Sequence, residues 1–308
     1  MNVGIVGLGA MGGGMAANLH RAGVLACVYN RSRQRSDEFI KTCSVDVAGS
    51  VADLAAGCDV IIICVSHDED VLAVVAQIEP VILPGTVVVD TSTVSHTTAK
   101  HVEKQLANRD AYFLDAPVSG GAEGAKNGTL AMMVGGDSVV LERVRPVLEA
   151  MTKTIVHMGG VGTGQATKAV NQIMGAGINQ AVTEALAFAE AEGLPIDKVI
   201  EVVGAGASGN WFLDHRGATM TQDEFAPGFK LGLHYKDLEI CKAMVAEHGV
   251  QLPVVEMTLI LKGTSIHCLW PLPDLKRADA RRNPPIRLVA LSRIVTQQTR
   301  ASDQALRG

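Results

Sequence analysis

Three polar side chains near the start of a long predicted helix are the strongest candidates for chemistry in this chain. Asn171 and Gln172 lie three and four residues after Lys168, which places all three side chains on one face of a helix. A lysine ammonium beside two amides can hold an oxygen atom and give it a proton. From the spacing alone, the alternative is a solvated polar first turn.

These residues belong to a stretch, Gly162–Glu192, that predicts one continuous helix. No proline interrupts it, and Gly193-Leu194-Pro195 follows as a stop signal. At about 1.5 Å per residue the helix would be roughly 45 Å long, which is enough to leave one domain and begin another. The pattern beyond Pro195 is helical, so we expect a first domain at 1–161 and an all-helical second domain at 162–308.

A glycine-rich motif near the N-terminus supplies a second chemical signal. It stands between a short apolar strand, Val3–Val6, and a helical pattern, which is the context of the dinucleotide-binding fingerprint G-x-G-x-x-G. In that motif the first glycine makes a tight turn, the second admits the pyrophosphate, and the third lets the helix pack on the strand. A merely structural glycine-rich turn is the alternative. The residues expected to bind the cofactor here are Gly7, Leu8, Gly9, Ala10, Met11 and Gly12.

The end of the second predicted strand indicates which nicotinamide cofactor is bound. A site specific for NAD usually has an acidic residue here to accept the ribose hydroxyls. This chain has Asn30, Arg31, Ser32 and Arg33 instead. Because guanidinium groups match a 2′-phosphate, these four residues favour NADP over NAD. A solvated basic loop is the alternative.

Further strands alternate with helices, which predicts an α/β fold with a Rossmann-type doubly wound sheet. The apolar runs Asp59–Val65 and Thr86–Asp90 are typical of buried parallel strands. Ligands bind at the carboxyl ends of such strands, so Val65, Ser66 and Thr93 are candidate cofactor contacts.

Two other polar clusters have a less certain meaning. Ser119, Gly120 and Gly121 form a turn whose hydroxyl and backbone N–H groups can cradle a carboxylate, although an ordinary tight turn has the same composition. The run Ser66–Asp70 contains a histidine and three acids, but a capped helix N-terminus explains it better than metal ligands do. We therefore expect no metal site.

The composition argues against several classes of protein. The chain has 308 residues and a formal net charge of −5, which gives no reason to expect nucleic acid as a partner. The longest uncharged run, Ala169–Thr183, is too short to span a bilayer, so no membrane is expected. No basic stretch precedes the apolar strand at Val3, and the six cysteines form no Cys-x-x-Cys pair. These features predict a cytoplasmic protein without a signal peptide.

Four blocks of the sequence together resemble the β-hydroxyacid dehydrogenase family, which includes 3-hydroxyisobutyrate dehydrogenases and 2-hydroxy-3-oxopropionate (tartronate semialdehyde) reductases. The blocks are GIVGLGAMGGGMAANL, DAPVSGGAEGAKNGTLAMMVGG, GTGQATKAVNQ and FAPGFKLGLHYKDL. The resemblance extends over about residues 1–260. It implies an NAD(P)-dependent enzyme that interconverts a small β-hydroxyacid and its semialdehyde, and that forms a homodimer or homotetramer through its helical half.

The resemblance also implies roles for particular residues. Lys168 matches the family's catalytic lysine, which acts as general acid and base during hydride transfer. Thr93 and Lys236 match contacts near the nicotinamide end of the cofactor. The residues that match the family's contacts to the substrate carboxylate and oxygen are Ser119, Gly120, Gly121, Asn171 and Gln172.

The substrate remains open between several relatives. The pair Asn171-Gln172 looks like that of tartronate semialdehyde reductases, whereas Asn30-Arg31-Ser32 looks like the NADP-using glyoxylate and succinic semialdehyde reductases of the family. A 6-phosphogluconate dehydrogenase-like enzyme would need a larger helical half, and Lys168 argues against an imine reductase. A catalytically silent NADP(H)-binding scaffold is the alternative from another functional class.

The stretch 261–308 departs from the family's pattern. From Lys262 onward it carries nine Lys and Arg residues against three Asp and Glu, and it holds four of the eleven prolines. A reading-frame change near residue 261 would produce such a break. A divergent ordered end, or a basic tail that binds an anion, are the alternatives.

Overall fold

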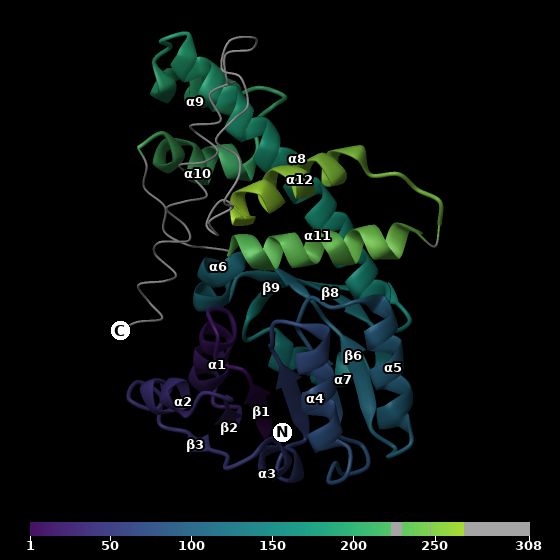
Figure 1. Ribbon diagram of the computed structural model, residues 1–308. Helices are drawn as coiled ribbons and strands as arrows, with labels where there is room; N and C mark the ends of the chain where they lie inside the picture. Colours follow the sequence, from purple (N-terminus) through teal and green to yellow (C-terminus); the bar gives the residue numbers. More distant parts are fainter. Residues whose placement is uncertain (223–229, 247, 268–308) are drawn as a thin grey trace. The chain divides into compact units, whose positions relative to one another are not determined.

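The computed structural model describes residues 1–222, 230–246 and 248–267, with side chains described as far as Leu261. The chain divides into two compact units, Met1–Asn171 and Gln172–Gly308 (Figure 1). The division falls inside the long helix α8 (Thr163–Ala191), ten residues after the boundary expected at 161/162. The first turns of α8, with Lys168 and Asn171, therefore belong to the first unit.

The first unit is a layered α/β structure built around one sheet. Its strands are β1 (Val3–Val6), β2 (Leu25–Tyr29), β3 (Asp46–Val47), β4 (Val60–Ile63), β5 (Val87–Asp90), β6 (Tyr112–Asp115), β7 (Val118–Ser119), β8 (Leu130–Gly135) and β9 (Thr152–Gly159). Its helices before α8 are α1 (Gly12–Arg21), α2 (Arg33–Phe39), α3 (Val51–Ala56), α4 (Asp68–Ile78), α5 (His96–Ala107), α6 (Gly121–Asn127) and α7 (Ser138–Leu148).

The strand order confirms the predicted Rossmann-type sheet. The strands run β3-β2-β1-β4-β5-β6 and are parallel, which is the order of doubly wound dinucleotide-binding domains. Beyond β6 the direction changes, because β8 pairs antiparallel with both β6 and β7, and β9 pairs parallel with β8. The turn expected at Ser119 is thus partly strand: Ser119 ends β7, and α6 begins two residues later.

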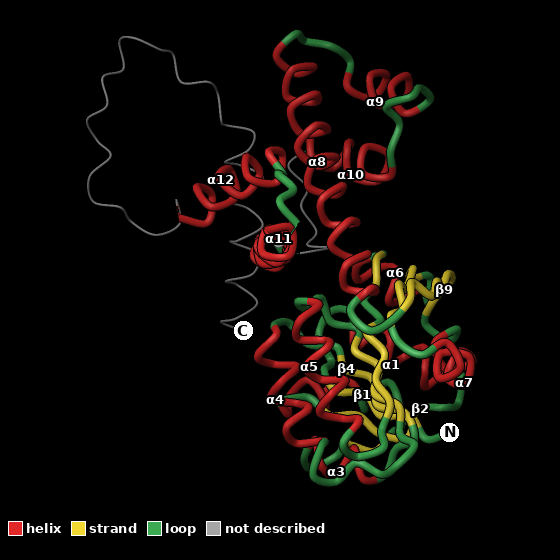
Figure 2. Tube along the Cα trace, turned by 90° about the vertical axis from the view of Figure 1, so that its right-hand side faces the viewer, coloured by secondary structure: helices red, strands yellow, loops and turns green. Residues whose placement is uncertain are grey.

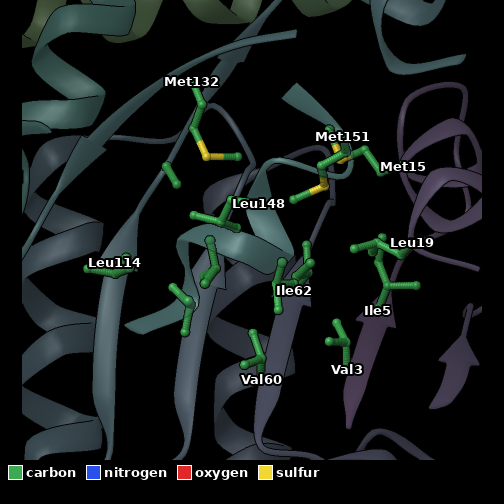
Figure 3. Packing of buried hydrophobic residues seen from close by; sticks show 14 of the residues in the cluster. Val3, Ile5, Met15, Leu19, Val60, Ile62, Leu114, Met132, Leu148 and Met151 are labelled. Atoms are coloured by element: carbon green, nitrogen blue, oxygen red, sulfur yellow. The ribbon is translucent and has the colours of Figure 1, made fainter. Parts of the chain in front are cut away.

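Two hydrophobic cores cover the two faces of this sheet. Successive side chains of a strand point to opposite faces, so in β4 Val60 and Ile62 pack in one cluster while Ile61 and Ile63 pack in the other. The first cluster contains residues of α1 and α7 (Figure 3), and the second contains residues of α3, α4 and α5. Figure 2 shows α4 and α5 on one side of the strands and α7 on the other. Burial on both faces explains the uninterrupted apolar runs of the sequence.

The second unit is helical over its described residues, as predicted. It consists of the remainder of α8, α9 (Ile196–Gly204), α10 (Trp211–Thr221), α11 (Leu231–Ala246) and α12 (Pro253–His267). Within the helical pattern beyond Pro195, the sequence predicts one helix over Ile196–Gly204 and another over Tyr235–His248. The first is confirmed, whereas the second starts earlier, at Leu231. The sequence also predicts a run that begins at Pro227-Gly228-Phe229, and these three residues lie outside the described residues. Of the atypical stretch 261–308, residues 268–308 lie outside them as well.

Separate clusters hold the two helix pairs of this unit to α8. Ala176 of α8 packs with Leu238 of α11 and Val255 of α12. Further along the same helix, Val182 and Leu186 pack with α10 through Leu213. Within the described residues, no helix has the length and apolar character needed to cross a membrane.

The start of α8 is fixed to the sheet by Asp115, the last residue of β6. One carboxylate oxygen of Asp115 accepts the N–H of Gly162 and the other accepts the N–H of Gln165, both at 2.8 Å. These are amides that the first turn of a helix leaves without a partner in the helix itself. A Cβ added to Gly164 would lie 2.4 Å from the carbonyl oxygen of Asp115 and 2.6 Å from that of Met133. The contact therefore requires glycine at position 164.

Alanine substitutions at two glycines of α8 should have opposite effects on stability. We expect Gly164→Ala to lower the free energy of unfolding by about 1–3 kcal/mol, because the new methyl group must displace backbone. At Gly175 the added Cβ meets nothing within 4 Å. Gly175→Ala should therefore be neutral or should raise that free energy by about 0.5–1 kcal/mol, as in an ordinary helix interior. Urea denaturation of both variants checks this, and equal stabilities would contradict it.

Candidate active site

The glycine-rich loop lies between β1 and α1, and two of its glycines are required by the protein's own packing. Gly7 has φ +103°, and a Cβ there would lie 2.1 Å from the carbonyl oxygen of Cys64. A Cβ on Gly12 would lie 2.0 Å from the carbonyl oxygen of Gly7. Gly9 differs, because within 4 Å its added Cβ would meet only the guanidinium of Arg35, at 3.6 Å. The loop therefore leaves room at Gly9, which is where the motif brings a pyrophosphate close to the backbone.

Asn30 connects the end of β2 to this loop. Its side-chain oxygen accepts the N–H of Leu8 at 2.9 Å, and its amide nitrogen donates to the carbonyl of Ser32 at 2.9 Å. Both ends of the amide are thus engaged by the backbone of the protein. The geometry makes Asn30 a link between the glycine-rich loop and the loop after β2.

Three arginines lie near the end of β2. The sequence predicted Arg31 and Arg33 as cofactor contacts but not Arg35. The side chain of Arg31 is 89% exposed and pairs with Asp70 at 3.0 Å, and Arg33 pairs with Asp37 at 3.0 Å. Arg35 is the guanidinium that approaches Gly9. The sequence did contain a signal for Arg35. It lies three residues after Ser32, about one turn into α2, and so on the same face of the helix as this predicted cofactor contact.

Ser92 connects the loops that carry the candidate cofactor contacts Val65 and Thr93, after β4 and β5. The N–H of Val65 donates to Ser92 Oγ at 3.0 Å, and the N–H of Ser92 donates to a carboxylate oxygen of Asp90 at 3.0 Å. Ser92 and Val94 are buried, while Thr93 between them is partly exposed. Ser66, next to Val65, is exposed. The loop thus presents Thr93 at the carboxyl edge of the sheet.

Lys168, Ser119 and Asn171 form one cluster in the first unit. The Nζ atom of Lys168 donates to the backbone carbonyl of Val118 at 2.9 Å, and Ser119 Oγ donates to Asn171 Oδ1 at 3.3 Å. Lys168 is only 7% exposed, so the alternative of a solvated polar turn is wrong for this residue. Gly120 after the serine has φ +131°, a value that L side chains rarely adopt. An ammonium, a hydroxyl and an amide are therefore assembled from two segments about 50 residues apart in sequence.

Gln172 and Lys236 are organised by a carboxylate in the second unit. Gln172 Nε2 donates to one oxygen of Asp237 at 2.6 Å, and the ammonium of Lys236 lies 3.0 Å from the other. Gln172 and Asp237 are both buried. Asp237 was visible in the sequence only as the neighbour of Lys236, and it is the residue that joins the two expected site residues of this unit.

Two buried carboxyl groups stand side by side at the carboxyl edge of the sheet. Asp90 of β5 is in register with Asp115 of β6, and both are fully buried. Burial raises the pKa of Asp90 to about 7 and that of Asp115 to about 6. Asp90 Oδ2 has no hydrogen-bond partner among the described residues. No group of three or more His, Cys, Asp or Glu in the described part of the chain is placed to hold a metal ion.

Comparisons with known proteins agree across most of the chain. Residues 2–160 match the family model of the NAD-binding domain of 6-phosphogluconate dehydrogenase. Residues 162–261 match the model described as NAD-binding of NADP-dependent 3-hydroxyisobutyrate dehydrogenase. The second match ends at residue 261, where the sequence departs from the family's pattern.

Individual relatives cover similar shares of the chain. The 2-hydroxy-3-oxopropionate reductase of Escherichia coli is 38% identical over 258 residues, which are 82% of this chain and 87% of the relative. The NAD-dependent L-serine dehydrogenase of Pseudomonas aeruginosa is 33% identical over 84% of this chain and 90% of the relative. Among solved structures, the Mycobacterium tuberculosis 3-hydroxyisobutyrate dehydrogenase with L-serine has a TM-score of 0.78 and 32% identity, over 87% of this chain and 94% of that chain.

The buried carboxyl of Asp90 should make the stability of the fold depend on pH. Its pKa is about 7 in the folded protein and about 3.9 in an unfolded chain, so the folded state binds the proton more tightly. That contribution is complete below the unfolded pKa and is lost as the pH rises through about 7. Asp90→Asn keeps an acceptor for the N–H of Ser92 but cannot titrate. We therefore expect wild-type protein to lose stability relative to Asp90→Asn as the pH rises from about 4 to about 7.

Urea midpoints of both proteins, measured at several pH values, check this expectation. Asp46→Asn, at an exposed position of β3, is the matched control and should follow the wild-type curve. Parallel curves for wild type and Asp90→Asn would contradict the assignment.

Proposed function

The chain belongs to the β-hydroxyacid dehydrogenase family, and we propose that it interconverts a small β-hydroxyacid and the corresponding semialdehyde. It is an NAD(P)-dependent oxidoreductase of the 3-hydroxyisobutyrate dehydrogenase type. The observation that carries the proposal is the cluster of Lys168, Ser119 and Asn171, which places a proton donor beside groups able to bind a carboxylate and an oxygen.

In this proposal Lys168 handles the proton. A bound nicotinamide cofactor supplies or accepts the hydride. When the aldehyde is reduced, the Lys168 ammonium donates a proton to the carbonyl oxygen, on which negative charge develops; in oxidation the neutral amine accepts the hydroxyl proton. The hydrogen bond from Nζ to the carbonyl of Val118 holds the lysine next to Ser119. A fixed position of this kind lowers the entropy cost of reaching the reactive geometry.

Ser119 and the turn that follows it would bind the substrate carboxylate. Its hydroxyl, which donates to Asn171 Oδ1 in the structure, would turn to donate to the carboxylate when substrate binds. The N–H groups of Gly120 and Gly121 lie at the N-terminus of α6. Asn171, already bonded to Ser119, would face the substrate oxygen together with Lys168. In the second unit, Gln172 and Lys236 would have the roles that the family resemblance implies for them, and Asp237 orients both side chains.

For the substrate we propose 2-hydroxy-3-oxopropionate or the semialdehyde related to 3-hydroxyisobutyrate. The Escherichia coli relative and the Asn171-Gln172 pair favour the first, while the second family model favours the second. Succinic semialdehyde, glyoxylate and L-serine belong in the same test. Each shares a carboxylate with the leading candidates, and a difference of one small group is worth only about 1–3 kcal/mol of discrimination.

For the cofactor we propose NADP in preference to NAD. The end of β2 carries Asn30 where an acidic residue would accept ribose hydroxyls, and this amide is engaged by the backbone. Arg31 is exposed next to it, and Arg35 approaches the glycine-rich loop. The Arg31 guanidinium can reorient toward a 2′-phosphate, because the ion pair described for it, with Asp70, is exposed.

We also propose that the protein is a homodimer or homotetramer. Several large apolar side chains of the second unit are exposed in the single chain. Phe188 is 64% exposed, Val202 69% and Ile260 69%. Exposed apolar surface of this kind is typical of an interface with another subunit.

The first test is turnover by the wild-type protein and by Lys168→Ala. Absorbance of NADPH or NADH is followed with 2-hydroxy-3-oxopropionate, methylmalonate semialdehyde, succinic semialdehyde and glyoxylate, and L-serine is tested in the direction of oxidation. We expect turnover with at least one compound, and a loss of about 10²- to 10⁴-fold in Lys168→Ala with cofactor binding retained. Lys104→Ala, an exposed lysine of α5, should behave as wild type. Wild-type protein that binds cofactor but converts none of these compounds would instead indicate a silent NADP(H)-binding scaffold.

The second test separates the two cofactors. Arg31→Ala and Arg35→Ala should each raise the KM for NADPH by about 10- to 100-fold, because each removes a charged hydrogen bond to a phosphate. The KM for NADH should change much less in Arg31→Ala, since NADH has no 2′-phosphate. Arg109→Ala is the control. Arg109 pairs with Glu79 at 3.6 Å and lies before the amino end of β6, away from the carboxyl ends of the strands. Equal effects on both cofactors in Arg31→Ala would overturn the NADP assignment.

A further inference from the structure

We propose that Gln165 is a positioning residue for hydride transfer, because its side chain fixes the loop that carries Thr93 to the helix that carries Lys168. The inference rests on the proposed function, in which Thr93 lies near the nicotinamide and Lys168 moves the proton. All of these residues belong to the first unit. Gln165 lies three residues before Lys168, on the same face of α8.

A single amide holds the backbone on both sides of Thr93. Gln165 Nε2 donates to the carbonyl of Ser92 at 2.9 Å, and Gln165 Oε1 accepts the N–H of Val94 at 3.2 Å. The side chain is 1% exposed, so water does not compete for either bond. Two contacts that flank one residue fix the orientation of both of its peptide groups. Thr93 is the partly exposed residue between them, and its direction is therefore set from α8.

The other end of this connection is equally fixed. The backbone N–H of Gln165 donates to Asp115 at 2.8 Å, which attaches this turn of α8 to the end of β6. One turn further on, Lys168 donates to the carbonyl of Val118. The distance from Thr93 to Lys168 is thus spanned by one helical turn and one buried amide. A flexible loop alone would leave that distance variable.

The site requires a side chain that donates and accepts at once. Methionine has a similar length but would leave the carbonyl of Ser92 and the N–H of Val94 without their described partner. An ionised glutamate can accept from Val94 but has no proton for Ser92. A protonated glutamate has both groups, because its O–H can donate while its carbonyl oxygen accepts. This difference provides a test that a general loss of stability would not reproduce.

The effect should extend to a second candidate cofactor contact. Ser92 Oγ also accepts the N–H of Val65, so a shift of Ser92 changes the loop after β4 as well. Enzymes lose about 10²-fold in rate when a reacting group is displaced by about 1 Å. We therefore expect the hydride-transfer step to suffer while the binding of the substrate carboxylate, which depends on Ser119, is spared.

The experiment compares wild type with Gln165→Met and Gln165→Glu. In Gln165→Met we expect kcat to fall about 10- to 100-fold, substrate KM to change little, and the primary isotope effect with 4-deuterated cofactor to increase. Independently of activity, amide hydrogen exchange in the peptide that contains Val94 should accelerate. Gln77→Met is the matched control, because the exposed Gln77 bonds only a carbonyl of its own helix, that of Ala73, at 3.1 Å. It should change none of these quantities.

The pH profile of Gln165→Glu decides between positioning and mere packing. Burial raises the pKa of a carboxyl at this position, so at alkaline pH this variant should resemble Gln165→Met. Its activity relative to wild type should recover as the pH falls and the buried carboxyl takes up a proton. The charged and titratable groups on the surrounding elements are common to both proteins, so the ratio at each pH isolates position 165. They are Asp68, Asp90, His96, Lys100, Asp115 and Lys168.

Each outcome has a definite meaning. Unchanged kcat and isotope effect in Gln165→Met, or an absence of recovery in Gln165→Glu at low pH, overturns the inference. If Gln165→Met does not fold, the pH profile of Gln165→Glu decides alone. Failure of the proposed function is recognised separately, because the wild-type protein would then convert none of the compounds, and the inference would fall with it.

Discussion

The first unit of this protein depends on the carboxylate of Asp115, which accepts the N–H groups of Gly162 and Gln165 at the start of α8. A helix start leaves such amides without partners, and a carboxylate satisfies two of them while matching the positive end of the helix. The contact fixes the rotation of α8 about its axis. That rotation determines which side chains face the ends of β5, β6 and β7, and therefore where Lys168 is placed.

Close backbone packing reinforces the same contact from both sides. A Cβ on Gly135 would lie 2.3 Å from a carboxylate oxygen of Asp115, and a Cβ on Gly164 would meet the Asp115 carbonyl. The glycines therefore allow the strand ends and the helix to approach within backbone contact. Buried amides then connect the polar groups that remain: Asn30 bonds the glycine-rich loop, and Gln165 bonds the loop of Thr93. Buried side chains of the first unit thus fix the loops at the carboxyl edge of the sheet through hydrogen bonds to their backbone, and these side chains need not touch a ligand.

A carboxylate has the corresponding place in the second unit. Asp237 is 3% exposed and engages both Gln172 and Lys236. A buried carboxyl group needs hydrogen-bond partners, and Gln172 and Lys236 supply them to its two oxygens. In both units the residues with proposed chemical roles are held by acids that were not among the site residues expected from the sequence.

Local patterns in the sequence were sufficient to predict many of the elements of this protein. The strand, glycine motif and helix at the N-terminus, the uninterrupted helix α8, and the shared face of Lys168 and Asn171 all follow from short-range periodicity and sterics, which the sequence contains directly. The partners of those residues could not be inferred in that way. The bond from Lys168 to Val118, the approach of Arg35 to Gly9, and the reach of Gln165 to Ser92 join segments that are distant in the chain. Only the packing of helices on the sheet decides which of many polar groups meet, because no spacing along the chain encodes those distances.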